Sequence, residues 1–152
     1  MAEHRAIIEW RNTASAADFT KGRYSREHAW TFDGGITVAA SSSPSVVPAP
    51  WSNAAHVDPE EAYVASISSC HMLSFLWVAS KRGFAVAHYR DDAVGVLTKN
   101  ERGKAWVSKV TLAPRIEWAD RAPTAEELAS LHHAAHDECF IANSVNTEIV
   151  TT

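Results

Sequence analysis

The sequence predicts an α+β fold in which antiparallel strands surround one long central helix. Three observations support this prediction. A long apolar segment between residues 58 and 83 carries helix start and stop signals, segments of alternating polarity precede and follow it, and a capping motif opens a second helix near the C-terminus. Strands that meet through short turns, with helices between them, are typical of an α+β domain.

The long apolar segment begins and ends as an α-helix should. Its first residues suit the start of a helix. Asp58 can accept hydrogen bonds from the first free backbone N–H groups, and Pro59 fits the first helical position. Glu60 and Glu61 place negative charge at the positive end of the helix dipole. It closes with two basic residues and a glycine: Lys81, Arg82 and Gly83. Serines and His71 interrupt the apolar run, which favours a buried core helix over a membrane span. Cys70, one of only two cysteines, lies about halfway along this helix.

Three strands are expected before the helix, over residues 4–10, 23–32 and 36–40. In the second of these, alternation places Arg26 on the face that carries the large aromatic side chains, and Arg23 on the opposite face. Since the aromatic face should be the covered one, we expect Arg26 to point inward and Arg23 to point outward.

The remaining elements follow the helix. Two strand-like segments cover residues 84–98 and 104–118, and the first is interrupted by charged residues. A capping box at Thr124 opens the second helix, and alternation over residues 145–149 indicates a final strand. The predicted order is therefore β-β-β-α-β-β-α-β.

Length, net charge and cysteine content limit the kinds of protein that this chain can be. A chain of 152 residues is long enough for one domain with its own core, which we place over residues 1–152. The formal net charge of −4 argues against a nucleic-acid partner. The N-terminus lacks the apolar core of a signal peptide, so the cytoplasm is the expected location. In that reducing compartment, two cysteines indicate redox chemistry more than a structural disulfide.

Two motifs carry a family resemblance. The first is the Asp-Pro-Glu-Glu opening followed by Cys70 ten positions after Glu60, and the second is the helix that ends at Cys139. Together they resemble the OsmC/Ohr family (osmotically inducible protein C and organic hydroperoxide resistance). The family commonly continues with Pro-Val-Ser after the second cysteine, whereas this chain has Phe-Ile-Ala-Asn-Ser, so it is similar to a divergent branch. The resemblance implies an OsmC-like fold and an intertwined homodimer with the cysteines near the interface.

The resemblance also implies a reaction. Members of this kind are thiol-dependent peroxidases that reduce organic hydroperoxides to alcohols without a metal or other cofactor. By this reading Cys70 attacks the peroxide and Cys139 closes a disulfide with it. An external dithiol, such as a lipoylated protein, then reopens that disulfide.

A cation is needed if Cys70 is reactive. Cys70 lies about three turns into its helix, where the helix dipole no longer favours a thiolate, and an apolar setting disfavours one. Arg26 is the candidate cation, with Arg23 as the alternative. Glu60 matches the family glutamate that hydrogen-bonds the arginine, yet it precedes Cys70 by ~15 Å along the helix. Either Glu60 holds an arginine that spans this gap, or a partner subunit supplies it.

Other interpretations stay open. Cys70 alone could be a small core residue, and His71, about 100° round the helix from it, could be a core or interface histidine with a possible role in the site. His132, His136 and Cys139 have a spacing that could bind zinc. The protein could also keep the fold and bind a small ligand in an apolar pocket without catalysis.

Overall fold

The computed structural model describes all residues, 1–152, and divides into two compact units, Met1–Ala62 and Tyr63–Thr152. Each unit is described by itself. A single domain over the whole chain stays a prediction.

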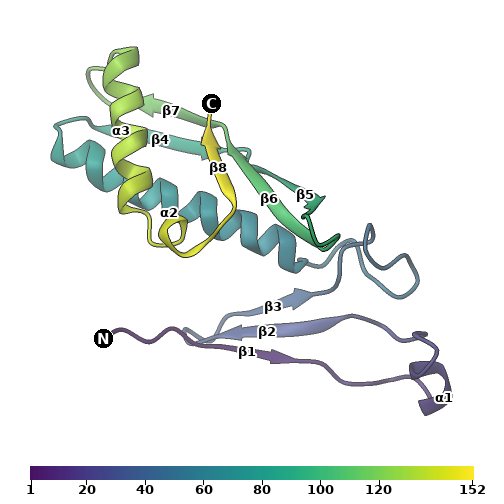
Figure 1. Cartoon of the computed structure of the whole chain (residues 1–152). Coiled ribbons are helices and arrows are strands. Elements are labelled where there is room, and N and C mark those ends of the chain that lie inside the picture. The colour runs from purple at the N-terminus through teal and green to yellow at the C-terminus, as the bar shows by residue number, and fades with distance from the viewer. The chain divides into compact units, whose positions relative to one another are not determined.

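The N-terminal unit contains a three-stranded antiparallel sheet (Figure 1). Its strands are β1 (Ala6–Glu9), β2 (His28–Phe32) and β3 (Thr37–Ala40), with β2 in the middle. The turn between β2 and β3 contains Gly35 at φ 85°, a conformation that glycine adopts without strain. The connection from β1 to β2 includes the short helix α1 (Ala16–Phe19).

The strand predicted over residues 23–32 is shorter than expected, because β2 begins only at His28. The backbone N–H of Arg26 donates to the carbonyl of Trp51, in the loop before α2, at 2.9 Å instead of pairing with a strand. Arg26 therefore does not lie in a strand, and the prediction that strand alternation turns its side chain inward was wrong in its premise. Arg26 is nevertheless half-buried and Arg23 is exposed.

The central helix α2 runs from Pro59 to Lys81, as predicted. Asp58 caps it, since the backbone N–H of Glu61 donates to Asp58 Oδ1 at 2.8 Å. The backbone N–H of Asp58 in turn donates to Glu61 Oε2 at 3.1 Å, which completes a reciprocal capping box. Gly83, at φ 79°, ends the helix. By length and apolar composition α2 could also cross a membrane, a test that core helices pass too.

The C-terminal unit contains two sheets. Each of the two strands predicted after α2 is divided in the structure, giving four strands and then a fifth near the C-terminus: β4 (Val86–Asp91), β5 (Val94–Lys99), β6 (Ala105–Leu112), β7 (Pro114–Trp118) and β8 (Glu148–Thr151). β4 pairs with β7, and the other sheet has the order β5-β6-β8. All pairs are antiparallel except β6–β8. The break between β4 and β5 lies next to the break between β6 and β7. At this place the backbone N–H of Ala113 donates to the Asp91 carboxylate at 2.7 Å.

Helix α3 (Ala125–Glu138) packs against α2 in the C-terminal unit, which contains two hydrophobic clusters (Figure 1). The first cluster joins Phe75 and Ala79 of α2 to Leu131 and Ala135 of α3. The second joins α2 to β6 through apolar side chains: Ile67, Val110 and Leu112. The predicted capping box of α3 is present, with the Glu127 and Thr124 groups bonded reciprocally. A short 3-10 helix, η1 (Ala142–Ser144), follows α3.

Candidate functional site: a cysteine pair between two helices

Helices α2 and α3 bring Cys70 and Cys139 together within the C-terminal unit. Both cysteines are free thiols. Cys70 is half-buried on α2, and Cys139, at the C-cap of α3, is only 1% exposed. The two thiols are neighbours although they lie 69 positions apart in the sequence, because consecutive backbone N–H groups, those of Ile141 and Ala142, reach one sulfur each.

The two thiols have different settings. The pKa of the Cys139 thiol is raised to about 11, mainly by burial and in addition by the neighbouring Cys70 thiol, against a smaller opposing effect from the Ala142 N–H. Cys139 is therefore a protonated thiol at neutral pH, and its S–H is available to donate to the Cys70 sulfur. Such a thiol is a poor first nucleophile, because only the thiolate attacks efficiently.

The tail after Cys139 lies against both sulfurs. The backbone N–H of Ile141 donates to Cys70 Sγ at 3.5 Å, and that of Ala142 donates to Cys139 Sγ at 3.4 Å. Phe140, the bulky residue next to Cys139, is 80% exposed and so does not hold the two sulfurs apart. The change from the common family tail thus leaves the cysteine pair in contact.

His71 does not act on a thiol in this structure but pairs with a histidine of α3. Its Nε2 lies 3.0 Å from His132 Nδ1, and the rings stack with centroids 5.4 Å apart. The pKa of His71 is lowered to about 4, mainly by burial and in addition by the nearby His132 and His136, against a smaller opposing effect of Asp91. Burial also lowers the pKa of His132. Both imidazoles are therefore neutral near pH 7.

The zinc alternative finds no support in this arrangement. No three His, Cys, Asp or Glu side chains are grouped so that they could hold a metal ion. His132 is instead occupied by its contact with His71, which the sequence spacing could not reveal.

Arg26 belongs to the N-terminal unit, where its guanidinium is held by neighbouring residues. Its Nη1 donates to the carbonyls of Gly22, at 2.8 Å, and Tyr24, and its guanidinium carbon lies 3.7 Å from the centre of the Tyr24 ring. No carboxylate pairs with Arg26, so a half-buried cation is left without a counter-charge in the chain.

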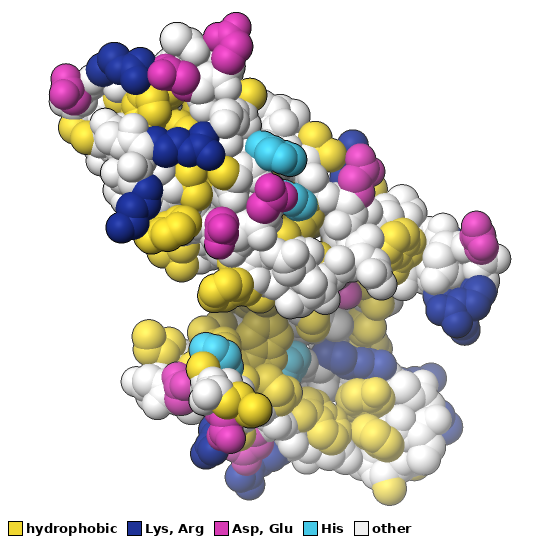
Figure 2. Space-filling view, turned by 60° about the vertical axis from the view of Figure 1, so that its left-hand side comes forward, with side chains coloured by type: hydrophobic (Ala, Val, Ile, Leu, Met, Phe, Trp, Pro, Cys, Tyr) yellow, Lys and Arg dark blue, Asp and Glu magenta, His cyan; other side chains and the backbone are white.

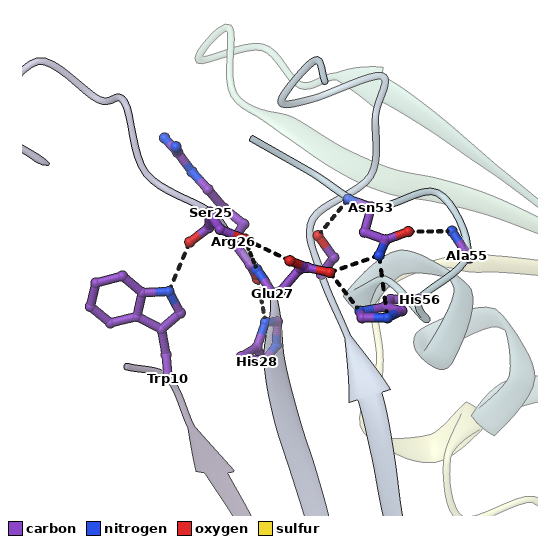
Figure 3. Close-up of polar contacts among 9 residues, drawn as sticks. Trp10, Ser25, Arg26, Glu27, His28, Asn53, Ala55 and His56 are labelled. Carbon is purple, nitrogen blue, oxygen red and sulfur yellow. Dashed lines mark hydrogen bonds and ion pairs between the residues drawn. The ribbon is translucent and has the colours of Figure 1, made fainter. Parts of the chain in front are cut away.

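A polar network fixes the backbone on both sides of Arg26 (Figure 3). Glu27 accepts a hydrogen bond from Asn53 Nδ2 at 2.7 Å and another from Ser25 Oγ at 3.1 Å, and both bonds lower the pKa of Glu27. His56 lies 3.7 Å from the same carboxylate. The network joins the segment before β2 to the loop before α2, which keeps Arg26 in a defined place.

Arg26 also lines an apolar cavity of about 430 Å³ in the N-terminal unit. Most of the lining is aromatic or aliphatic: Ile8, Trp10, Phe19, Tyr24, His28 and Pro59, with Ser41 and Ser42 as polar members. Such a cavity is large enough for a small organic molecule.

Glu60 and Arg23 make no ion pair within the chain. Glu60 is half-buried near the start of α2, where Glu61 rather than Glu60 provides the cap. Since Arg26, Arg23 and Glu60 belong to the other unit, their contact with the cysteine pair stays a prediction. The sequence missed the contributions of His132 and of the Ile141 N–H, because neither residue carries a local signal.

The fold and the site describe an α+β protein with a contacting pair of free thiols. The chain belongs to the family described as OsmC-like protein, whose model matches residues 52–152. It is 53% identical to an OsmC-like protein of unknown function from Vibrio cholerae O1 biovar eltor str. N16961, covering 100% of this chain and 99% of that chain with a TM-score of 0.94.

More distant structures share the fold. An organic hydroperoxide resistance protein from Elizabethkingia anophelis is 19% identical, with a TM-score of 0.75 over 100% of this chain and 95% of that chain. The organic hydroperoxide resistance protein OhrB of Bacillus subtilis is 17% identical, with a TM-score of 0.69 over 99% and 96%. At these identities the likeness shows the fold alone. No curated protein matches the sequence.

Proposed function

We propose that this protein is a thiol-dependent peroxidase that reduces organic hydroperoxides to alcohols. The observation that carries the proposal is the proximity of two free thiols, the half-buried Cys70 of α2 and the buried Cys139 at the end of α3, at the same turn of the chain. Proteins of the same fold are named organic hydroperoxide resistance proteins, which supports the class of substrate.

In the proposed reaction the Cys70 thiolate attacks the terminal peroxide oxygen. The O–O bond breaks, Cys70 becomes a sulfenic acid, and the departing alkoxide takes up a proton to leave as the alcohol. The Cys139 sulfur then attacks the Cys70 sulfur, and the hydroxyl group leaves with the Cys139 proton as water. An external dithiol, such as a lipoylated protein, reduces the resulting disulfide. Each cycle thus consumes two thiol hydrogens for one hydroperoxide.

We assign Arg26 the role of stabilising the Cys70 thiolate. Arg26 is a half-buried cation without a carboxylate partner, and its remaining N–H groups are free to bind an anion. A positive charge close to an acidic group favours its ionised form, and a carboxylate beside an arginine has its pKa lowered by about one to three units. Glu60 would orient that guanidinium, as the family resemblance implies.

We further propose a homodimer. In the N-terminal unit Ala40 is the only buried hydrophobic residue, whereas Ile7, Ile8 and Ile36 are each more than 60% exposed. Hydrophobic side chains are visible on the molecular surface (Figure 2). A sheet without a core is not stable in isolation. A second copy of the chain, intertwined with the first, would cover these residues. Sedimentation at twice the chain mass of 16.6 kDa is the expected result.

The peroxidase proposal is tested by hydroperoxide consumption with a dithiol as reductant. Replacing Cys70 by serine should abolish turnover and leave the circular dichroism spectrum unchanged, because the remaining thiol, Cys139, is buried and protonated and so is a poor first nucleophile. The matched variant Cys139→Ser should still react once and then stall or over-oxidise at Cys70. Full activity of Cys70→Ser would refute the proposal.

The role of Arg26 has its own test. Arg26→Ala should raise the pH at which half of Cys70 is alkylated by about one unit or more. Arg23→Ala, which removes an exposed arginine, is the matched control. If Arg23→Ala moves the alkylation profile and Arg26→Ala does not, the cation has been assigned to the wrong residue.

A non-catalytic ligand-binding protein is the second candidate, favoured by the cavity around Arg26. It predicts saturable binding of a small apolar molecule together with no consumption of hydroperoxide. The dithiol assay separates the two functions directly.

A further inference from the structure

The turn that follows α3 donates backbone hydrogen bonds to both cysteine sulfurs. Residues 140–144 present two consecutive N–H groups, one to each sulfur: Ile141 to Cys70 Sγ at 3.5 Å and Ala142 to Cys139 Sγ at 3.4 Å. A hydrogen bond to the charged form of a thiol stabilises that form, and a bond to an anion is stronger than one to a neutral acceptor. The Ile141 N–H therefore favours the anionic sulfur of Cys70.

One side chain holds this turn in place. The amide of Asn143 donates through Nδ2 to the Asp137 carbonyl at 2.9 Å and to the Cys139 carbonyl at 3.0 Å. Its backbone N–H also donates to the Cys139 carbonyl, at 3.0 Å. Carbonyls at the end of a helix have no partner within the helix, so an amide that bonds them fixes how the chain leaves α3. A second bond, from Ser144 Oγ to the Phe140 carbonyl at 2.7 Å, closes the same turn.

We propose that Asn143 is a positioning residue for the cysteine pair: its side-chain amide fixes the turn after α3 so that the Ile141 N–H points at the Cys70 sulfur. Asn143 touches neither sulfur and acts only through the backbone. The use of the thiolate for peroxide reduction rests on the proposed function, whereas the effect of Asn143 on the thiolate does not.

The geometry also explains how a tail without Pro-Val-Ser can serve this site. The two N–H groups come from the second and third residues after Cys139, and the side chain of Phe140 is turned to solvent. What the site requires from this segment is the path of its backbone. In this chain the amide of Asn143 secures that path.

The test compares two substitutions at Asn143 in the full protein with both cysteines present. Asn143→Asp keeps the shape of the side chain but, when ionised, has no N–H to donate, and Asn143→Ala removes the polar group altogether. Asn100→Ala is the matched control, because Asn100 also bonds two backbone groups in a turn, the hairpin between β5 and β6. Alkylation of Cys70 is followed by peptide mass mapping across pH.

Both Asn143 variants should raise the pH of half-alkylation of Cys70 by about one unit, which corresponds to about tenfold less thiolate below that pH. Asn100→Ala should leave the profile unchanged. If either Asn143 variant fails to fold, judged by circular dichroism, Ser144→Ala loosens the same turn more gently and should shift the profile in the same direction.

An unchanged profile in folded Asn143 variants, or an equal shift in Asn100→Ala, would overturn the inference. The proposed function fails separately, when the native protein does not consume hydroperoxide in the presence of a dithiol. A native protein without peroxidase activity that still shows the Asn143 shift would retain the positioning role and lose only the proposed reaction.

Discussion

Acidification should destabilise this protein through the buried imidazole of His71. In the folded chain the pKa of His71 is lowered from 6.5 to about 4, first by burial and then by the neighbouring histidines. Above pH 6.5 neither the folded nor the unfolded chain protonates this ring. Between pH 6.5 and 4 mainly the unfolded chain does, so the free energy of unfolding falls as the pH falls.

The size of the effect follows from the two pKa values. The gap between 6.5 and about 4 corresponds to about 3 kcal/mol, most of which should be lost by pH 4. This is a large share of the ~5–15 kcal/mol that stabilises a typical domain. His132, whose pKa is also lowered by burial, acts in the same direction.

Urea unfolding at a series of pH values between 7 and 4 measures this loss. His71→Phe keeps a planar ring in the core but cannot bind a proton, so its stability should fall with pH by about 3 kcal/mol less than that of the native protein. Its stability at pH 7 should be lower, because His132 loses its partner. His4→Gln, at an exposed position, should leave the pH dependence unchanged. Parallel pH curves for the native protein and His71→Phe would refute the reasoning.

Two further outcomes are expected. A stoichiometric amount of hydroperoxide should form a reversible disulfide between Cys70 and Cys139 of one chain, measured by peptide mapping and on non-reducing gels. If Cys70 stops at sulfenic acid, or forms a disulfide only between chains, Cys139 has a packing role instead. Gly95→Ala should lower the free energy of unfolding in urea by ~1–3 kcal/mol, because a Cβ there would lie 2.4 Å from Cγ2 of the stiff Val64 side chain. Gly34→Ala, where a Cβ meets nothing within 4 Å, is the control, and equal losses at both glycines would contradict the steric argument.

Features of this protein that depend on local signals could be predicted from its amino-acid sequence. Both long helices begin at reciprocal capping boxes, and such a box needs only residues three positions apart. The glycine that ends α2 is equally local, because its positive φ depends on the residue itself. The α+β class followed from the periodicity of the apolar residues, and the motif around Cys70 pointed to the OsmC-like family.

The boundaries of the strands were harder to predict from the sequence. Where β4 gives way to β5 and β6 to β7, the Asp91 carboxylate accepts the backbone N–H of Ala113, a residue 22 positions later. The parallel pairing of β6 with β8 likewise joins distant segments. Arg26 reached its half-buried place through a loop contact with Trp51 rather than through strand alternation.

The pairing of the cysteines and of the histidines could not be predicted from the sequence, because it depends on the packing of distant segments. The contact of Cys70 with Cys139 and that of His71 with His132 join residues more than 60 positions apart, and each depends on how α2 packs against α3. Neither the protonated state of Cys139 nor the neutral state of His71 is a property of its neighbours in the sequence. Both arise from burial, which removes water from the charged form, and burial is created only when the helices and strands come together.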